Sequence, residues 1–168
     1  YERALISNSC DHLIIATPDQ EIMNWASHHD IPAILTSHEH ERATERAAEV
    51  VEILESKEHF YDYILLLQGD EPQIDPSDIS KLKGAFDEFK ASVVNLVFPI
   101  DGGDLSDPNI VKAIISRSNK IHFFTRAHVP YQCKKGVRQL GMIGFTNQSL
   151  KRYVKLEMTE LEILESID

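Results

Sequence analysis

The alternation of short apolar runs with amphipathic segments in the first half of the chain restricts its fold more than any other feature. Each of three β-type runs is followed by a segment whose apolar residues recur at helical spacing. The predicted strands are Leu13–Thr17, Ala33–Thr36 and Tyr63–Leu67, and the predicted helices extend from Pro18 to about His28, from Arg42 to Glu55 and from Pro76 to Phe89. This order of elements is typical of a parallel, doubly wound α/β sheet.

The second half of the chain has a different pattern, because its β-runs follow one another with loops between them. The predicted strands are Val93–Ile100, Val111–Ile115, Ile121–Thr125 and Gly141–Phe145, with a hairpin turn at Ser116–Lys120 and a final helix from Asn147 to about Tyr153. No repeat, low-complexity tract or clear linker divides the chain, so we predict one α/β domain over residues 1–168 with a mixed sheet. Helical patterns at Tyr1–Ile6 and Leu161–Asp168 lead us to expect a domain that is incomplete at both ends.

The segment after the third predicted strand carries the strongest functional signal. Gln68-Gly69-Asp70-Glu71-Pro72 ends the apolar run abruptly, since Gly69 permits an unusual backbone angle and Pro72 cannot continue a ladder. Ligands of open α/β sheets bind at the carboxyl ends of the strands. Asp70 is therefore well placed to hold Mg²⁺ beneath a nucleotide phosphate. The alternative is that Asp70 only caps the helix or turn that follows.

Charge and cysteine content exclude several classes of protein. The chain has 17 Lys and Arg against 27 Asp and Glu, a net charge of −10, which disfavours nucleic-acid and anionic-membrane partners. Cys10 and Cys133 lie far apart, which excludes a disulfide scaffold and fits a reducing compartment, so we predict a cytoplasmic protein. No apolar run approaches the ~18 residues of a membrane span. Neither a P-loop nor a G-x-G-x-x-G or G-x-S-x-G motif occurs.

Four arginines are candidate ligands for anions. Thr44 and Arg46 lie at a predicted helix start, where backbone amides favour an anion, and Arg46 or Arg42 could clamp a phosphate. Arg42 and Arg46 repel each other at this spacing unless an anion lies between them. Arg126 and Arg138 lie at strand ends and could neutralise a sugar carboxylate with bidentate hydrogen bonds. The alternative for each arginine is an ordinary surface ion pair.

Acidic and histidine side chains are weaker candidates. Glu162 and Glu165 share one predicted helical face and could receive sugar hydroxyls or a metal, although such residues more often face solvent. His38-Glu39-His40 offers two zinc ligands, but no third ligand is evident nearby.

Several segments, in this order, resemble motifs of the 3-deoxy-manno-octulosonate cytidylyltransferases (CMP-Kdo synthetases). The family's Q-G-D-E-P matches Gln68–Pro72. The other similar segments are Ala43–Arg46, Asn109–Lys112, Phe123–Pro130, Arg138–Phe145 and Glu160–Glu165. The resemblance covers nearly the whole chain.

The resemblance implies a Rossmann-like nucleotidyltransferase (GT-A-like) fold, a three-layer α/β sandwich of the nucleotide-diphospho-sugar-transferase type. It also implies a homodimer that transfers CMP from CTP to a Kdo-like 3-deoxy-2-keto sugar acid in lipopolysaccharide biosynthesis, releasing pyrophosphate, with Mg²⁺ as cofactor. The implied site residues are Gln68 and Asp70 for catalysis, with Asp70 the metal ligand, Thr44, Arg46 and Gly69 for the nucleotide, and Arg126, Arg138, Gln139, Glu162 and Glu165 for the sugar acid.

The chain departs from the family pattern in ways that leave alternatives open. The N-terminal P-A-R-x-x-S-x-R-L-P-G-K-P signature and the late V-D-T-P-E-D segment are both absent. We therefore expect this polypeptide alone to bind CTP poorly, and a catalytically inactive domain for sugar binding or dimerisation is the alternative hypothesis. Use of another nucleotide is a third. Gln139 and Ile143 replace the family's histidine and aromatic residue in the expected sugar pocket, so another octulosonic or nonulosonic acid is an alternative substrate.

Overall fold

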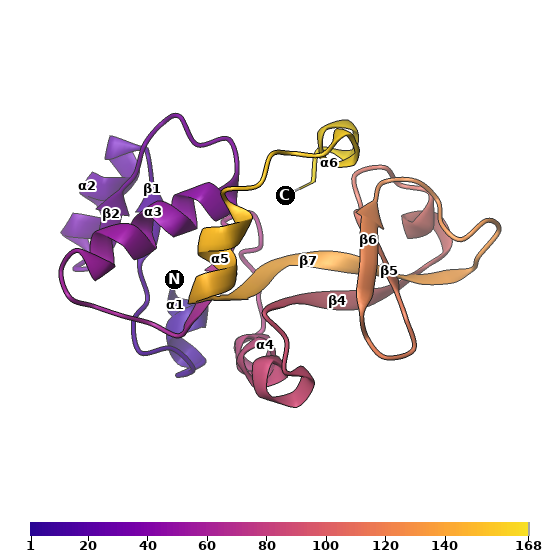
Figure 1. The fold of residues 1–168 in the computed structure, drawn as a ribbon, viewed down its shortest axis with the longest axis horizontal. Helices are drawn as coiled ribbons and strands as arrows, with labels where there is room; N and C mark the ends of the chain where they lie inside the picture. Colours follow the sequence, from indigo (N-terminus) through magenta and orange to yellow (C-terminus); the bar gives the residue numbers. More distant parts are fainter. Residues whose placement is uncertain (168) are drawn as a thin grey trace. The chain divides into compact units, whose positions relative to one another are not determined.

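The computed structural model describes residues 1–167. Packing divides them into two compact units. Unit 1 comprises Tyr1–Val94 and Met142–Leu156, and unit 2 comprises Asn95–Gly141 together with the segment that starts at Glu157. Helices occur with both parallel and antiparallel strand pairs (Figure 1), which confirms the predicted α/β class. The prediction of a single domain over residues 1–168 stays a prediction.

Unit 1 contains most of the helices. Its elements are α1 (Glu2–Ile6), β1 (Ile15–Thr17), α2 (Gln20–His28), β2 (Ala33–Leu35), α3 (Ala43–Glu55), β3 (Tyr63–Leu67), α4 (Pro76–Phe89) and α5 (Asn147–Tyr153). Strands β4 (Val93–Asp101) and β7 (Lys135–Thr146) belong in part to each unit. The predicted elements of unit 1 agree with these bounds to within two residues, apart from β7, which starts earlier than predicted.

Side-chain caps determine where two of these helices begin. The carboxylate of Asp19 accepts a hydrogen bond from the Glu21 N–H (2.7 Å), and that of Asp75 accepts one from the Ser77 N–H (2.8 Å). Pro76 occupies the first turn of α4, where no N–H is required. These local signals are visible in the sequence, which explains why the starts of α2 and α4 were predictable.

The strands of unit 1 pair in two different ways. β1 and β2 are parallel, with Ile15 opposite Ala33, as the predicted strand–helix–strand pattern requires. β3 instead pairs antiparallel with β7, with Tyr63 opposite Thr146. Within residues 1–167, β3 forms no ladder with β1 or β2. The predicted extension of a parallel sheet to β3 is not observed, because an alternating pattern shows where strands occur but not which strands are neighbours.

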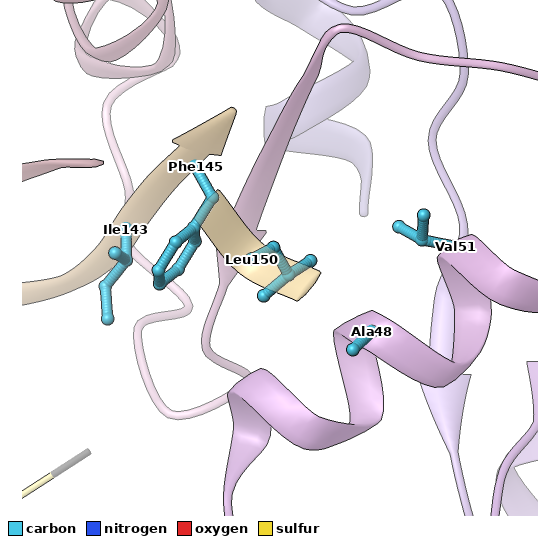
Figure 2. Close-up of a cluster of buried hydrophobic side chains, with 5 residues drawn as sticks. All are labelled: Ala48, Val51, Ile143, Phe145 and Leu150. Carbon is cyan, nitrogen blue, oxygen red and sulfur yellow. The ribbon is translucent and has the colours of Figure 1, made fainter. Parts of the chain in front are cut away.

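A buried cluster joins α3, β7 and α5 (Figure 2). Its members are Ala48, Val51, Ile143, Phe145 and Leu150. Figure 2 shows Leu150 between the side chains of β7 and helix α3, and its side chain is fully buried. The helices α3, α4 and α5 all pack against β3. This core supports β3 and therefore the loop at its carboxyl end.

Gly144 lies where α4 meets β7 and leaves no room for a side chain. A Cβ atom there would lie 2.7 Å from Cγ2 of Val94 and 2.8 Å from Cζ of Phe86, and both neighbours are buried. We expect Gly144→Ala to lower the free energy of unfolding by about 1–3 kcal/mol, since overpacking a dense core forces its neighbours to shift. Chemical denaturation measures the change. Gly84→Ala is the control, because a Cβ at Gly84 meets no atom within 4 Å and alanine favours helix α4. Equal losses in both variants would contradict this account.

Unit 2 is mainly β-structure. Besides parts of β4 and β7 it contains η1 (Gly102–Leu105), β5 (Lys112–Ile115), β6 (Ile121–Thr125) and α6 (Glu160–Glu165). β5 and β6 form the predicted hairpin, closed by a hydrogen bond from the Ser116 N–H to the Lys120 carbonyl oxygen (2.8 Å). β7 begins at Lys135 rather than at the predicted Gly141, because its first residues are largely polar and lack the apolar run that marks a strand.

The last helix is shorter than the helical pattern suggested. α6 ends at Glu165, and Ser166 adopts a left-handed conformation with φ of 50°. The predicted continuation to Asp168 reaches a residue outside the described part of the chain. None of the helices in residues 1–167 is long and apolar enough to cross a membrane.

Candidate functional site

The loop after β3 carries the catalytic candidates. The chain leaves the strand at Gln68, which is half-buried, and turns so that the Glu71 N–H donates to the Gln68 carbonyl oxygen (3.3 Å). Gly69 and Asp70 are exposed. The unusual backbone angle expected at Gly69 is not observed, since the φ angle of Gly69 is not positive. A Cβ atom at this position would also meet no other atom within 4 Å. The turn is formed by hydrogen bonding rather than by a glycine requirement.

Asp70 presents a free carboxylate to solvent. It has no hydrogen-bond or ion-pair partner among residues 1–167. The alternative role as a cap of α4 is excluded, because Asp75 caps that helix. No group of three or more His, Cys, Asp or Glu side chains in the described part of the chain is arranged to hold a metal. Mg²⁺ is commonly held by one or two carboxylates together with substrate phosphates and water, and Asp70 fits that role.

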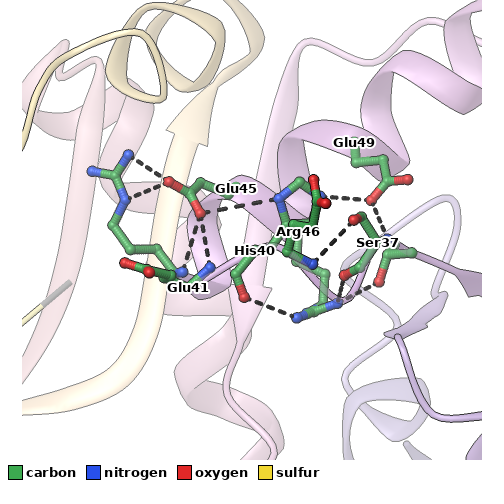
Figure 3. Close-up of polar contacts among 9 residues, drawn as sticks. Ser37, His40, Glu41, Glu45, Arg46 and Glu49 are labelled. Carbon is green, nitrogen blue, oxygen red and sulfur yellow. Dashed lines mark hydrogen bonds and ion pairs between the residues drawn. The ribbon is translucent and has the colours of Figure 1, made fainter.

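Arg46 organises the loop that joins β2 to α3 (Figure 3). Its guanidinium donates to the hydroxyl of Thr36 (2.5 Å) and to the carbonyl oxygens of Ser37 (3.0 Å) and His40 (3.5 Å). The guanidinium of Arg46 is thus bonded to the protein in this structure. Its predicted contact with a nucleotide stays a prediction.

The neighbouring arginine is balanced by its own helix. Arg42 forms an ion pair with Glu45 (2.8 Å), and the Glu45 carboxylate also accepts the Arg42 N–H (3.2 Å). Glu45 therefore balances the positive charge of Arg42. Thr44, predicted to face the nucleotide, is buried at the start of α3, and its role stays a prediction.

Glu49 completes the loop network. Its carboxylate accepts hydrogen bonds from the Ser37 N–H (2.8 Å) and from Nε2 of His40 (2.7 Å). Burial acts to raise the pKa of Glu49, but these hydrogen bonds and the nearby charges of His40 and Arg46 lower it below its ordinary value. His40 is thus engaged with a carboxylate, and the His38-Glu39-His40 segment gains no third metal ligand among the described residues.

The lowered pKa of Glu49 predicts a dependence of stability on pH. The ionised carboxylate stabilises the fold above its unfolded-state pKa of about 4.3, and this contribution is lost as the pH falls through the lower folded-state pKa. We expect the stability difference between the wild type and Glu49→Gln to shrink as the pH is lowered from about 6 to about 3. Denaturation at a series of pH values measures it. Glu52→Gln, an exposed change on the same helix, should show a small constant difference; a constant difference for Glu49→Gln as well would contradict the prediction.

Arg126 and Glu165 form a reciprocal network in unit 2. Arg126 donates its Nε–H to the Glu165 carbonyl oxygen (2.6 Å), and its terminal nitrogens donate to the carbonyl oxygens of Pro108 (3.0 Å) and Ser166 (3.1 Å). In return the Glu165 carboxylate accepts the hydroxyl of Thr125 (2.5 Å) and the N–H of Arg126 (2.7 Å). These two hydrogen bonds lower the pKa of Glu165. The network joins the end of β6 to the end of α6.

A buried lysine lies beside this network. Lys112 is 1% exposed, and its ammonium donates to the carbonyl oxygens of Asp107 (2.5 Å) and Arg126 (2.9 Å). Burial lowers the pKa of Lys112, with a smaller opposing effect from the carboxylate of Asp107. Lys112 was not among the functional residues predicted from the sequence. The available signal was a lysine inside an otherwise apolar β-run.

The remaining sugar-acid candidates have different surroundings. The guanidinium of Arg138 lies 6.0 Å from the centre of the Phe98 ring. The Gln139 N–H donates to the Val111 carbonyl oxygen (2.9 Å), and its side chain is half-buried. Glu162 caps its own helix, since its carboxylate accepts the Thr159 N–H (2.7 Å). The contacts of these three residues with a substrate stay predictions.

The predicted site residues divide cleanly between the two units. The nucleotide and metal candidates Thr44, Arg46, Gln68, Gly69 and Asp70 all belong to unit 1. The sugar-acid candidates Arg126, Arg138, Gln139, Glu162 and Glu165 all belong to unit 2. Within unit 2 the structure brings Arg126 and Glu165 into direct contact.

Comparisons with known proteins agree with one another. A family model described as cytidylyltransferase matches residues 1–168. The 3-deoxy-manno-octulosonate cytidylyltransferase of Wolinella succinogenes is 32% identical over 173 residues, which cover 94% of this chain and 69% of that protein. The protein of the same name from Fusobacterium nucleatum is 33% identical over 174 residues, which cover 100% of this chain and 69% of that protein.

A solved structure is similar over almost the whole chain. It is a CMP:2-keto-3-deoxy-manno-octonic acid synthetase in complex with CTP, with a TM-score of 0.86 and 28% sequence identity. The similarity covers 99% of this chain and 69% of that protein. The fold implied by the resemblance, that of a Rossmann-like nucleotidyltransferase, is thereby confirmed.

Proposed function

This chain belongs to the cytidylyltransferase family of nucleotidyltransferases, and we propose that the intact protein transfers CMP from CTP to a Kdo-like 3-deoxy-2-keto sugar acid, with release of pyrophosphate. The observation that supports this most is the similarity, over 99% of the chain, to a synthetase whose structure contains CTP. That similarity includes both the unit that carries Asp70 and the unit that carries Arg126.

The proposed reaction is a displacement at phosphorus. The anomeric hydroxyl oxygen of the sugar acid attacks the α-phosphorus of CTP, and the bond from this phosphorus to the bridging oxygen of the β-phosphate breaks. The hydroxyl proton is released, CMP becomes attached to the sugar acid, and pyrophosphate leaves. Positioning of the two reactants and neutralisation of the phosphate charge provide most of the catalysis in such reactions.

Asp70 is the residue that would hold Mg²⁺. Its carboxylate is exposed, lacks a partner among residues 1–167 and follows the carboxyl end of β3. When bound, Mg²⁺ neutralises the triphosphate and favours ionisation of the attacking hydroxyl. Gln68 and Gly69 would lie beside the reacting groups, and Thr44 and Arg46 would support the nucleotide side of the site.

Unit 2 would bind the sugar acid. Arg126 and Arg138 would neutralise its carboxylate, because a guanidinium pairs well with planar anions. Gln139, Glu162 and Glu165 would lie near its hydroxyls. The side chain of Gln139 is close in size to that of the family's histidine, but it cannot carry a positive charge. This difference would affect which sugar acid the site accepts.

The proposal also covers the oligomeric state, the location and the biosynthetic role of the protein. We propose that it is a cytoplasmic homodimer and, because its substrate is Kdo-like, that it takes part in lipopolysaccharide biosynthesis. Cys10 and Cys133 are free thiols, which supports a reducing compartment. The net charge of −10 supports the absence of nucleic-acid and membrane partners.

Calorimetric titration tests the nucleotide. We expect the intact protein to bind CTP in the presence of Mg²⁺ at least about tenfold more tightly than UTP, GTP or ATP, a difference of about 1.4 kcal/mol. Tighter binding of another nucleotide would favour the alternative that the protein uses that nucleotide in place of CTP. Binding of a sugar acid without binding of any nucleotide would favour the inactive sugar-binding domain.

A further inference from the structure

We propose that Glu165 is a positioning residue that acts through Arg126, rather than a direct ligand of sugar hydroxyls. Both carboxylate oxygens of Glu165 are already hydrogen-bonded, one to the hydroxyl of Thr125 (2.5 Å) and the other to the N–H of Arg126 (2.7 Å). Thr125 is 3% exposed, so one of these bonds comes from a buried hydroxyl group. The inference rests on the proposed function, because it assigns the way in which that site holds its anion.

The other half of the network fixes the guanidinium. Arg126 has five N–H donors in one rigid plane. Three of them are directed at carbonyl oxygens, namely those of Glu165 (2.6 Å), Pro108 (3.0 Å) and Ser166 (3.1 Å). Three bonds from one planar group leave it little freedom to rotate.

The remaining donors face no acceptor in the described part of the chain, residues 1–167. Nη1 uses one of its two N–H groups on Pro108, and Nη2 uses one of its two on Ser166. One N–H on each terminal nitrogen is therefore left without an acceptor among residues 1–167. Arg126 is also only half-buried, so an anion can reach these donors. A carboxylate has two oxygens that match such a pair of N–H groups.

Glu165 contributes to this arrangement with both its side chain and its backbone. The side chain holds the backbone of Arg126, and the carbonyl of the same residue holds Nε. Loss of the Glu165 carboxylate would release the end of α6 from β6. The carbonyl oxygens of Glu165 and Ser166, two of the three that fix the Arg126 guanidinium, would then no longer be held in place. The consequence is a weaker site for the carboxylate of the sugar acid with little change at the nucleotide.

Steady-state kinetics of variants of the intact protein test the inference. We expect Glu165→Ala to raise KM for the sugar acid by about tenfold or more, in keeping with the loss of a hydrogen bond to a charged group. We expect kcat and the KM for CTP to stay within about twofold of the wild-type values, because neither depends on how the carboxylate of the sugar acid is bound. Glu165→Gln should restore most of the sugar-acid affinity, since the amide oxygen can accept the Arg126 N–H and the amide NH2 can donate to the hydroxyl of Thr125. Glu160→Ala, an exposed change on the same helix, should behave as the wild type.

A double-mutant cycle separates positioning from direct contact. If Glu165 acts through Arg126, the effect of Glu165→Ala disappears in an Arg126→Ala background. Independent effects that add up would overturn the inference, as would an unchanged KM for the sugar acid or an equal rise in KM for CTP. A wild-type protein that neither binds nor converts any sugar acid would overturn the proposed function and this inference together. An active wild type with additive effects would overturn this inference alone.

Discussion

We expect Asp70→Asn to lower kcat/KM of the intact protein by about 10³-fold while the fold and the melting temperature stay the same. Asparagine keeps the size of the side chain but removes the negative charge that a hard cation such as Mg²⁺ prefers. The melting temperature is expected to stay unchanged because Asp70 is exposed and has no partner among the described residues. Pyrophosphate release and thermal melting of the two proteins measure both quantities.

Asp87→Asn is the matched control for this prediction. Asp87 is exposed on α4, and the substitution removes the same charge from the same unit. The control should retain wild-type activity. Wild-type activity in Asp70→Asn would remove Asp70 from the metal role and leave the proposed site without a candidate metal ligand.

We expect Lys112→Ala to destabilise the protein by roughly 2–5 kcal/mol, the range for the loss of a hydrogen-bond donor together with the formation of a cavity. The Lys112 ammonium is the donor to the carbonyl oxygens of Asp107 and Arg126, and its side chain is 1% exposed. Alanine leaves both acceptors in the interior without this partner. Chemical denaturation of the variant measures the loss.

Two further variants divide this effect into its parts. Lys112→Met fills the space but supplies no hydrogen-bond donor. Its free energy of unfolding should therefore lie between that of the wild type and that of Lys112→Ala. Lys120→Ala removes an exposed lysine from the turn beside β5 and should change stability by less than about 0.5 kcal/mol. A loss from Lys112→Ala as small as that from Lys120→Ala would show that the buried ammonium stabilises little.

Local signals determined which elements of the fold could be predicted. The bounds of α4 follow from Asp75, Pro76 and the apolar spacing of the helix, all of which act within a few residues. The pairing of β3 could not be predicted, because its partner, the last part of β7, lies far away in the sequence. Register and neighbour choice depend on tertiary packing, which a single sequence pattern does not contain.

The candidate site shows the same division. Asp70 was identified because a strand, a turn and a carboxylate are adjacent in sequence. The engagement of Arg46 with Thr36 and Ser37 could not be predicted, because it depends on how a loop folds back onto α3. Lys112 was overlooked since its significance comes from burial and from two backbone carbonyls, neither of which its residue type reveals.

The contact between Arg126 and Glu165 was likewise outside the reach of sequence patterns. The two residues are 39 positions apart, and the resemblance to the family motifs placed both near the sugar acid without relating one to the other. The structure supplies the relation, a set of reciprocal hydrogen bonds that holds a guanidinium in place. The family motifs therefore predicted which residues belong to the site, and the structure shows how two of these candidates contact each other.

The decisive measurement is the release of pyrophosphate from CTP by the intact protein, in the presence of Mg²⁺ and of each member of a panel of 3-deoxy-2-keto sugar acids. We expect release that depends on CTP, on Mg²⁺ and on one sugar acid of the panel, together with formation of the CMP-linked sugar. No release with any sugar acid, from a folded protein that binds CTP, would contradict the claim and favour a domain that binds without catalysing transfer.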